Sequence, residues 1–214
     1  MAQYHDFLLT ISTSQSDELT APGVPPTSNF SRTNLAEHFW RVIESGDLPA
    51  LKEILALNPD IDVNVQDSFG FGPLHWACYR GHPKTVELLL LRRDLAVNLQ
   101  SNSGSTPFLL ACYFRQAACI GHLLRDTRVQ PNIPEKDGTT PCYYLVRHDS
   151  YDLLEQWIAS GRYIDVGSPE KPETDAIRCA LNANNLRLVT LLERLVKDPE
   201  ATIQQSRESL QVSG

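Results

Sequence analysis

The sequence predicts an all-α solenoid built from helix-turn-helix repeats. The first observation is a fixed period, because a glycine, a proline and an asparagine each recur with a step of 34 residues. The positions are Gly70, Gly104, Gly138, Pro73, Pro107, Pro141, Asn64, Asn98 and Asn132. A period of this length is typical of a repeat array. The second observation is that apolar residues within each period recur at helical spacing, which predicts two short helices in each repeat.

The stretch from Asp67 to Asn98 shows the repeating unit most clearly. A glycine-rich turn signal at residues 69–72 precedes Pro73, which is tolerated at the first position of a helix because its missing N–H would be unpaired there. A second apolar helix follows the turn at residues 81–83. Each helix is shorter than the ~12–15 residues at which an isolated helix becomes marginally stable. The unit therefore needs neighbouring repeats to pack against.

Short motifs recur where these helices begin. The stretch Gly72-Pro73-Leu74-His75-Trp76-Ala77 is similar to a TPLHxA motif, residues 105–108 and 139–142 carry shortened forms of it, and Asp62-Val63-Asn64 matches a DVN hairpin. With these motifs, residues 35–196 resemble the ankyrin repeat family. The resemblance implies an ankyrin-repeat solenoid, which is an all-α stack of helix-turn-helix units with short β-hairpin fingers between them. It is highly specific for the fold and says little about the partner.

The composition divides the chain into three parts. Residues 1–33 are rich in Ser, Thr and Pro, and we expect disorder there because such a segment buries too little apolar surface to order itself. Its apolar island at residues 7–11 either lies loosely on the array, docks a partner, or covers an exposed repeat end. Residues 34–196 are the expected ankyrin-repeat domain. Residues 197–214 are expected to be a polar tail or a short helix.

Five repeat units follow one another in the second part. They span residues 35–64, 67–98, 101–133 and 135–166 and the segment after the Pro-rich insertion at 168–173. The first lacks the Thr-Pro start, as terminal repeats often do, and the fifth is expected to be the C-terminal cap. Arg115 and Asp149 stand where the second repeat has a glycine between its helices. We expect left-handed dihedrals at both, which Asp accepts better than Arg.

Composition excludes several classes of partner. A net charge of −7 and a pI near 5.3 argue against nucleic acid and against anionic membranes. No run approaches the 18 apolar residues of a spanning helix, and the N-terminus lacks the basic start of a signal peptide. Five cysteines, mostly in predicted helices, indicate a reduced environment. We expect an intracellular, cytoplasmic monomer, with nuclear entry left to diffusion or a partner.

The sequence offers little catalytic chemistry. The usual phosphate, hydrolase, zinc-protease and dinucleotide motifs are absent. Two His/Cys pairs at helical spacing, His75 with Cys78 and Cys119 with His122, could in principle hold zinc. However, His75 occupies the TPLH position, whose histidine the family resemblance implies is structural. Packing is therefore the favoured interpretation, and we expect no metal and no cofactor.

The family resemblance places the partner-binding residues at the finger tips and at the ends of the first helices, on the concave side. The expected partner-binding residues are Phe69, Phe71, Tyr79, Arg80, Tyr113, Phe114, Arg147 and His148. Aromatic residues clustered with arginine are typical of binding hot spots. The alternative is that the phenylalanines fold back and fill gaps between repeats.

The resulting hypothesis is a non-enzymatic protein–protein interaction module, a scaffold or adaptor. One alternative is a regulatory or chaperone-like subunit that shields a basic client protein with its acidic surface. A second alternative is an enzyme hidden in the array, for which Cys119 would be the candidate residue.

Overall fold

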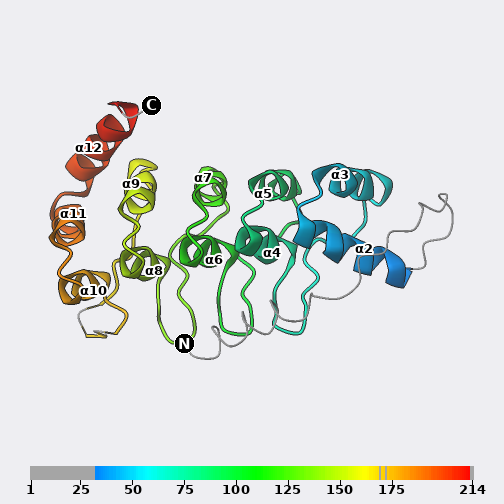
Figure 1. The fold of residues 1–214 in the computed structure, drawn as a ribbon, viewed down its shortest axis with the longest axis horizontal. Helices are drawn as coiled ribbons and strands as arrows, with labels where there is room; N and C mark the ends of the chain where they lie inside the picture. Colours follow the sequence, from blue (N-terminus) through cyan, green and yellow to red (C-terminus); the bar gives the residue numbers. More distant parts are fainter. Residues whose placement is uncertain (1–31, 169, 172, 213–214) are drawn as a thin grey trace.

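The computed structural model describes residues 32–168, 170–171 and 173–212, and Figure 1 shows them as an elongated stack of helix pairs. The inner row consists of α2 (Arg32–Ser45), α4 (Pro73–Arg80), α6 (Pro107–Tyr113), α8 (Pro141–Arg147) and α10 (Ala176–Asn182). The outer row consists of α3 (Leu48–Leu57), α5 (Pro83–Leu90), α7 (Ala117–Arg125) and α9 (Tyr151–Ala159). At the C-terminal end, α11 (Leu186–Lys197) pairs with α10, and α12 (Pro199–Val212) follows. The expected disorder of the N-terminal part and its apolar island lie outside the described residues.

Each inner helix of the central repeats begins at a proline whose neighbour caps the helix. The hydroxyls of Thr106 and Thr140 accept hydrogen bonds from the backbone N–H groups of Leu109 and Tyr143, both at 3.2 Å. Gly72 has no side chain to do this at the start of α4. Instead, its own N–H donates to Nδ1 of His75 at 3.0 Å. The TPLH-like motifs are therefore helix starts, as the sequence predicted.

The turn between the two helices of a repeat holds one residue in the left-handed region. This residue is Gly46, Gly81, Arg115, Asp149 and Asn184 in the successive repeats, with φ values of 70°, 71°, 56°, 50° and 53°. The expectation for Arg115 and Asp149 is confirmed. Of these residues Arg115 bears the largest steric cost, because it has neither glycine's freedom nor the short side chain of Asp or Asn.

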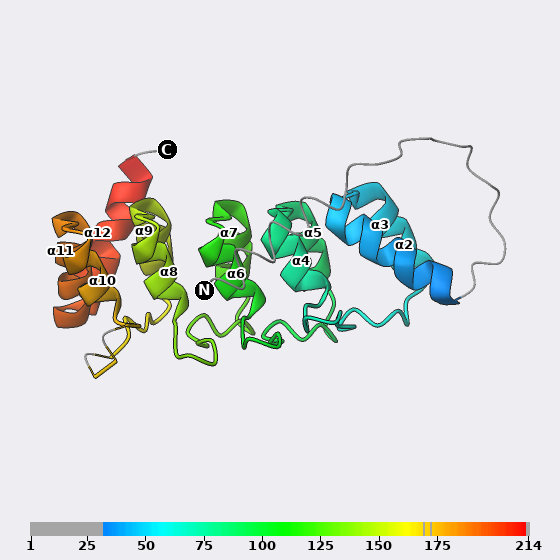
Figure 2. The same cartoon turned by 60° about the horizontal axis from the view of Figure 1, so that its bottom comes forward.

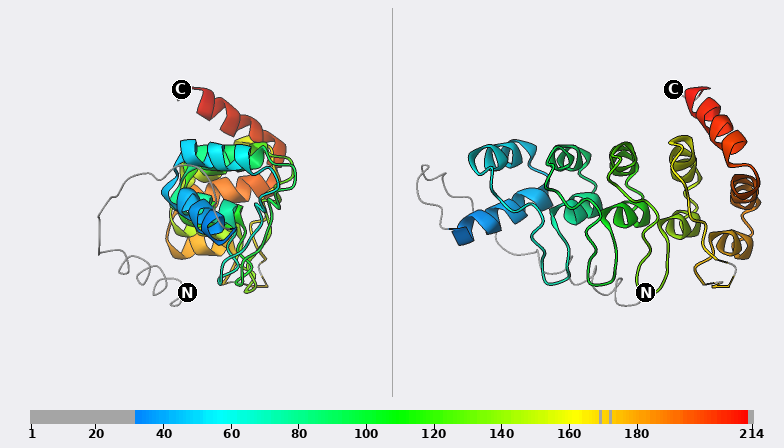
Figure 3. Two further views of the ribbon diagram at one scale, coloured as in Figure 1. Left: turned by 90° about the vertical axis from the view of Figure 1, so that its right-hand side faces the viewer. Right: turned by 180° about the vertical axis from the view of Figure 1, so that it is seen from behind.

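The fingers project from the inner row to one side of the stack, and Figures 2 and 3 show them next to one another. In the second repeat the finger closes through hydrogen bonds from the Asp67 N–H to the Phe71 carbonyl (3.0 Å) and from the Gly70 N–H to the Asp67 carbonyl (2.9 Å). The fingers are hairpin-shaped loops, and no regular strand occurs in the described residues. The Asn102 N–H donates to the Phe69 carbonyl at 2.9 Å, which ties adjacent tips together.

The asparagines that recur every 34 residues join consecutive repeats. The side chain of Asn64 donates to the carbonyl of Asp94 (2.8 Å) and accepts from the N–H of Ala96 (2.7 Å), so it pairs with the next repeat as a strand would. Asn98 makes the same two bonds to the third repeat, and Asn132 makes them to the fourth. The asparagine ladder, defined as Asn64, Asn98 and Asn132, is the physical reason for that period.

Arginines next to the asparagine ladder reach backwards along the stack. Arg128 donates from its two terminal nitrogens to the carbonyls of Arg92 (2.9 Å) and Leu90 (2.7 Å) in the preceding repeat. Arg162 does the same to the carbonyls of Asp126 and Val129. Because Leu90 is the last residue of α5, Arg128 also satisfies a carbonyl that the end of a helix leaves open.

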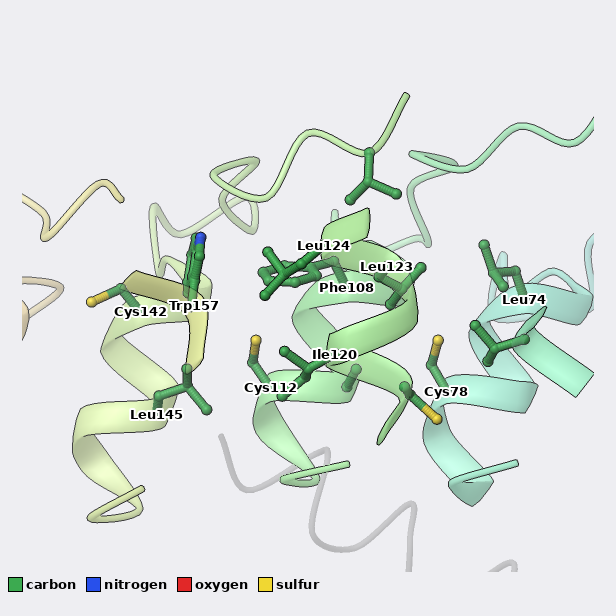
Figure 4. Close-up of a cluster of buried hydrophobic side chains, with 14 of the residues drawn as sticks. Leu74, Cys78, Phe108, Cys112, Ile120, Leu123, Leu124, Cys142, Leu145 and Trp157 are labelled. Carbon is green, nitrogen blue, oxygen red and sulfur yellow. The ribbon is translucent and has the colours of Figure 1, made fainter. Parts of the chain in front are cut away.

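The core runs continuously between the two rows. Leu51, Leu89, Leu123 and Leu154 on successive outer helices are fully enclosed. Figure 4 shows side chains of the inner and outer helices meeting, with the cysteines of α4, α6 and α8 among them. Phe108 and Trp157 pack edge to face, with ring centroids 5.0 Å apart. No helix could be stable alone at these lengths, so this continuous burial is what holds the array together.

Helix α12 packs against both α9 and α11. It thus lies beside α9, in the position that an outer helix takes in the regular part of the stack (Figure 1). Thr202 and Ser206 are buried in this contact, and the Nε of Arg207 donates to the carbonyl of Ala159 at 2.9 Å. The C-terminal segment is therefore part of the folded unit over the residues that the structure describes.

Candidate protein-binding surface

Aromatic side chains from three inner helices line up across the repeats. We call them the aromatic stripe, and its members are Trp76, Tyr79, Phe114, Tyr113, Tyr144 and His148. They come from α4, from α6 and the residue that caps it, and from the equivalent end of α8. Because the inner helices are stacked in parallel, residues at equivalent positions of successive repeats become neighbours in space.

The first half of the stripe joins the second and third repeats. The rings of Trp76 and Tyr79 lie 5.5 Å apart at 83°, and the rings of Tyr79 and Phe114 lie 4.7 Å apart at 81°. Both are edge-to-face contacts, the arrangement that the charge distribution of aromatic rings favours. Tyr79 and Phe114 are each half-buried. They therefore leave part of each ring available to a partner while the rest is held in place.

The second half of the stripe joins the third and fourth repeats. Tyr113 contacts Phe114, Tyr144 and His148, with centroid distances of 4.8, 4.9 and 5.4 Å. Tyr144 is buried beneath Tyr113 and donates its hydroxyl hydrogen to Glu135 at 2.6 Å. Burial raises the pKa of Glu135, and burial together with this carboxylate raises the pKa of Tyr144. The hydrogen bond thus holds the Tyr144 ring in place, and Tyr113 packs against that ring.

Arg80 lies at the second-repeat end of the stripe, against Trp76 and Tyr79. Its guanidinium lies 5.7 Å from the centroid of Trp76 and 5.3 Å from that of Tyr79, within the range of cation–π attraction. It also forms an ion pair with Glu44 of α2. A cavity of about 490 Å³ adjoins this end and is lined by His38, Arg41, Val42, Glu44, Ser45, Asp47 and Arg80. Arg80 is consequently held by three groups and has little freedom to move.

The two finger phenylalanines have different surroundings. Phe71 is only 5% exposed and stacks on His75, with centroids 5.4 Å apart and planes at 6°. It fills the base of the finger, as the alternative interpretation of the phenylalanines expected, and it offers a partner almost no surface. Phe69 at the tip is 44% exposed. Its position keeps it a candidate contact at the edge of the surface.

The other end of the stripe is basic. Arg147, the last residue of α8, is exposed, and His148 caps that helix. Arg115 follows Phe114 in the preceding repeat and is also exposed. Burial is the main cause that lowers the pKa of His148, and the charges of Arg115 and Arg147 lower it further. Both arginines therefore act on the same imidazole ring.

Sequence reasoning placed Tyr79, Arg80, Tyr113, Phe114, Arg147 and His148 at the helix ends, and the structure gathers the aromatic ones into one stripe. It missed Trp76, Tyr144 and Arg115 as neighbours of this surface. Trp76 could have been found, because it lies three residues before Tyr79 and thus on the same helix face. Tyr144 could not, since its position under Tyr113 depends on how α6 and α8 stack.

The residues considered for metal binding or catalysis have other roles. Nδ1 of His75 accepts from Gly72, and its Nε2 lies 3.0 Å from the carbonyl of Ser105, so both ring nitrogens are engaged. Burial raises the pKa of the Cys119 thiol to about 11, so little of the reactive thiolate forms near neutral pH. Within the described ranges, no three His, Cys, Asp or Glu side chains converge on a point that could hold a metal ion.

Stacked helix pairs with a stripe of half-buried aromatic rings across their inner row define a repeat protein with an extended surface. Residues 39–134 match the family model for ankyrin repeats, in three copies. This stretch of the chain therefore carries ankyrin repeats, and the resemblance found in the sequence motifs is confirmed. Ankyrin repeats are generally protein–protein interaction modules. No curated protein matches the chain.

The helices of the described residues were also compared with the requirements of a membrane span. None of them combines the length and the apolar character needed to cross a bilayer.

Proposed function

We propose that this chain is a non-catalytic scaffold or adaptor that binds a protein partner on the concave side of its inner helices. The observation that carries the proposal is the continuity of the aromatic stripe. Ring contacts run without a break from Trp76 through Tyr79, Phe114 and Tyr113 to His148. Half-buried aromatic residues that are already fixed lose little entropy when a partner covers them.

The charges around the stripe help to choose between partners. The chain as a whole has a net charge of −7, which would suit a basic client. The stripe, however, carries Arg80 at one end and Arg115 and Arg147 at the other, and only Arg80 has an acidic partner among the described residues. This local charge supports an adaptor for an apolar or acidic segment over a subunit that shields a basic client.

We further propose an intracellular, cytoplasmic setting and a monomeric array. All five cysteines are free thiols, and four of them are buried in the repeats. Unpaired cysteines in this number suit a reducing compartment.

The test is a quantitative pull-down from native lysate with three forms of the full chain: wild type, Tyr79→Ala/Tyr113→Ala, and Tyr163→Ala. Tyr163 is the matched control, because it is 77% exposed but lies outside the stripe, in the loop after α9. We expect at least one protein to bind wild type and Tyr163→Ala but not the double variant. Circular dichroism should show equal helix content in all three. Equal capture by all three forms would reject the stripe as the binding site.

A further inference from the structure

The basic end of the stripe has charges that the described residues do not neutralise. Four ion pairs occur in the described part of the chain, and none of them includes Arg115 or Arg147. The nearest acid in sequence is Asp149, which accepts a hydrogen bond from Asn185 at 2.6 Å. The Nε2 atom of His148 is enclosed without a partner in the same ranges. The positive charge at this end of the stripe is therefore complementary to an anionic group.

Arg115 also occupies its position at a cost. The first two repeats have Gly46 and Gly81 here, and the backbone of Arg115 takes the same left-handed conformation, with φ of 56°. That conformation is sterically unfavourable for a residue that has a Cβ. Backbone strain of this kind points to a function for the side chain when no structural contact of that side chain offsets the strain. Arg115 is exposed and forms no ion pair with the described residues.

The chain itself contains a segment of complementary chemistry. Residues 1–31 hold three acidic residues, Asp6, Asp17 and Glu18, and no lysine or arginine. Asp6 is the one that directly precedes the apolar run Phe7-Leu8-Leu9-Thr10-Ile11. A carboxylate next to large apolar side chains is what a surface of aromatic rings ending in two arginines would bind.

We propose that residues 6–11 of this chain bind along its own aromatic stripe, with the carboxylate of Asp6 between Arg115 and Arg147 and the apolar side chains on Tyr113, Phe114 and Tyr79. The segment then competes with any external partner for the same surface. The inference goes beyond the proposed function, since it concerns the state of the surface before a partner binds.

The chain is long enough for this arrangement. The basic end lies at α8, three inner helices beyond α2, and neighbouring helices pack about 8–10 Å apart, so the stack contributes roughly 30 Å. The length of α2 itself adds about 20 Å at most. Fully extended, the chain from Asp6 to Arg32 reaches roughly 85 Å. Since binding within one chain corresponds to an effective concentration near the millimolar range, even a weak contact would be populated.

Hydroxyl-radical footprinting of the full-length protein tests the proposal, because it measures how accessible individual Tyr and Phe side chains are. The forms compared are wild type, Asp6→Arg, Arg147→Asp, and the charge swap Asp6→Arg/Arg147→Asp. We expect oxidation of Tyr79 and Phe114 to rise several-fold in each single variant and to return toward the wild-type rate in the swap. Reversing one charge should weaken the contact about tenfold, which is the effect of losing ~1.4 kcal/mol.

Tyr163 provides the internal control, since it is exposed away from the stripe and its oxidation should be equal in all forms. Equal protection of Tyr79 and Phe114 in wild type and Asp6→Arg would overturn the proposal. Protection that grows with protein concentration would overturn it as well, because the occupant would then be a second copy of the chain.

These outcomes are independent of the proposed function. Footprinting is done with no partner present, so failure of the segment to bind leaves partner binding untouched. Conversely, loss of partner binding in the pull-down would not alter the footprint of the isolated chain.

Discussion

The rings of Tyr79 and Phe114 meet edge to face between α4 and α6, with centroids 4.7 Å apart and planes at 81°. This contact belongs to the aromatic stripe and connects the second repeat to the third.

A double-mutant cycle measures that contact. We expect Tyr79→Leu and Phe114→Leu to show a coupling energy of about 0.5–1.5 kcal/mol, because each single change already removes the ring pair and the second costs less. The measurement is urea unfolding of the four forms, followed by circular dichroism. Additive single changes would mean that the rings contribute only as separate surfaces.

Arg115→Gly should stabilise the protein by about 1 kcal/mol, because glycine adopts the left-handed conformation at φ of 56° without a steric cost. Arg115→Ala is the matched control: it removes the same side chain but keeps the Cβ, so we expect no such gain. Thermal and urea unfolding of both variants check this. An Arg115→Gly protein no more stable than Arg115→Ala would show that the backbone there is unstrained.

His75 should make stability fall as the solution becomes acidic. Burial lowers its pKa to about 4 in the folded protein, opposed by the Ser105 carbonyl and by Asp67, whereas the unfolded chain has the ordinary value of 6.5. The unfolded state therefore takes up a proton as pH falls below 6.5, and the folded state does so only near 4. Between pH 7 and pH 5 the loss attributable to His75 is about 2 kcal/mol.

The check is urea unfolding of wild type and His75→Asn at both pH values. We expect the variant to be less stable at pH 7 but to lose about 2 kcal/mol less than wild type on going to pH 5. A proton NMR titration of wild type gives a second reading, and a His75 resonance that titrates near pH 6.5 would contradict the prediction.

Arg128→Ala should destabilise the array by about 1–3 kcal/mol, because two backbone carbonyls of the preceding repeat lose a charged hydrogen-bond donor. Arg125→Ala is the comparison, since Arg125 is exposed at the end of the neighbouring helix α7 and its loss should change stability by less than about 0.5 kcal/mol. Urea unfolding measures both. Equal effects would mean that Arg128 contributes only general surface charge.

Leu123→Ala should cost about 2–5 kcal/mol, because this side chain of α7 is completely enclosed between the rows and its removal leaves a cavity. Leu91→Ala is a suitable control, as Leu91 is 74% exposed at the end of α5. Differential scanning calorimetry of the two variants should show a large drop in melting temperature for the first and little change for the second.

The repeating fold could be predicted from the sequence because the residues that recur with the period have local roles. Pro73, Pro107 and Pro141 begin helices, and Gly81 ends one, so their positions could be interpreted without knowing the packing. The asparagine period could be recognised but not explained. The hydrogen bonds of Asn64 go to a different repeat, and only the stacked structure shows their partners.

The binding surface was less predictable, for a related reason. The ends of the inner helices could be located from the repeat, which gave Tyr79, Tyr113 and Phe114. Whether an aromatic residue at such a position faces a partner or fills a gap depends on distances of a few ångströms between repeats. Phe71 and Phe69 are two residues apart in sequence, yet one is buried on His75 and the other is at the exposed tip.

The asparagine ladder has a consequence for how the protein melts. Asn64, Asn98 and Asn132 each satisfy backbone groups of the following repeat, and Arg128 and Arg162 satisfy those of the preceding one. A repeat that unfolds therefore removes hydrogen-bond partners from both of its neighbours. Fraying from one end is penalised at every step, and the first four repeats should melt in a single cooperative transition.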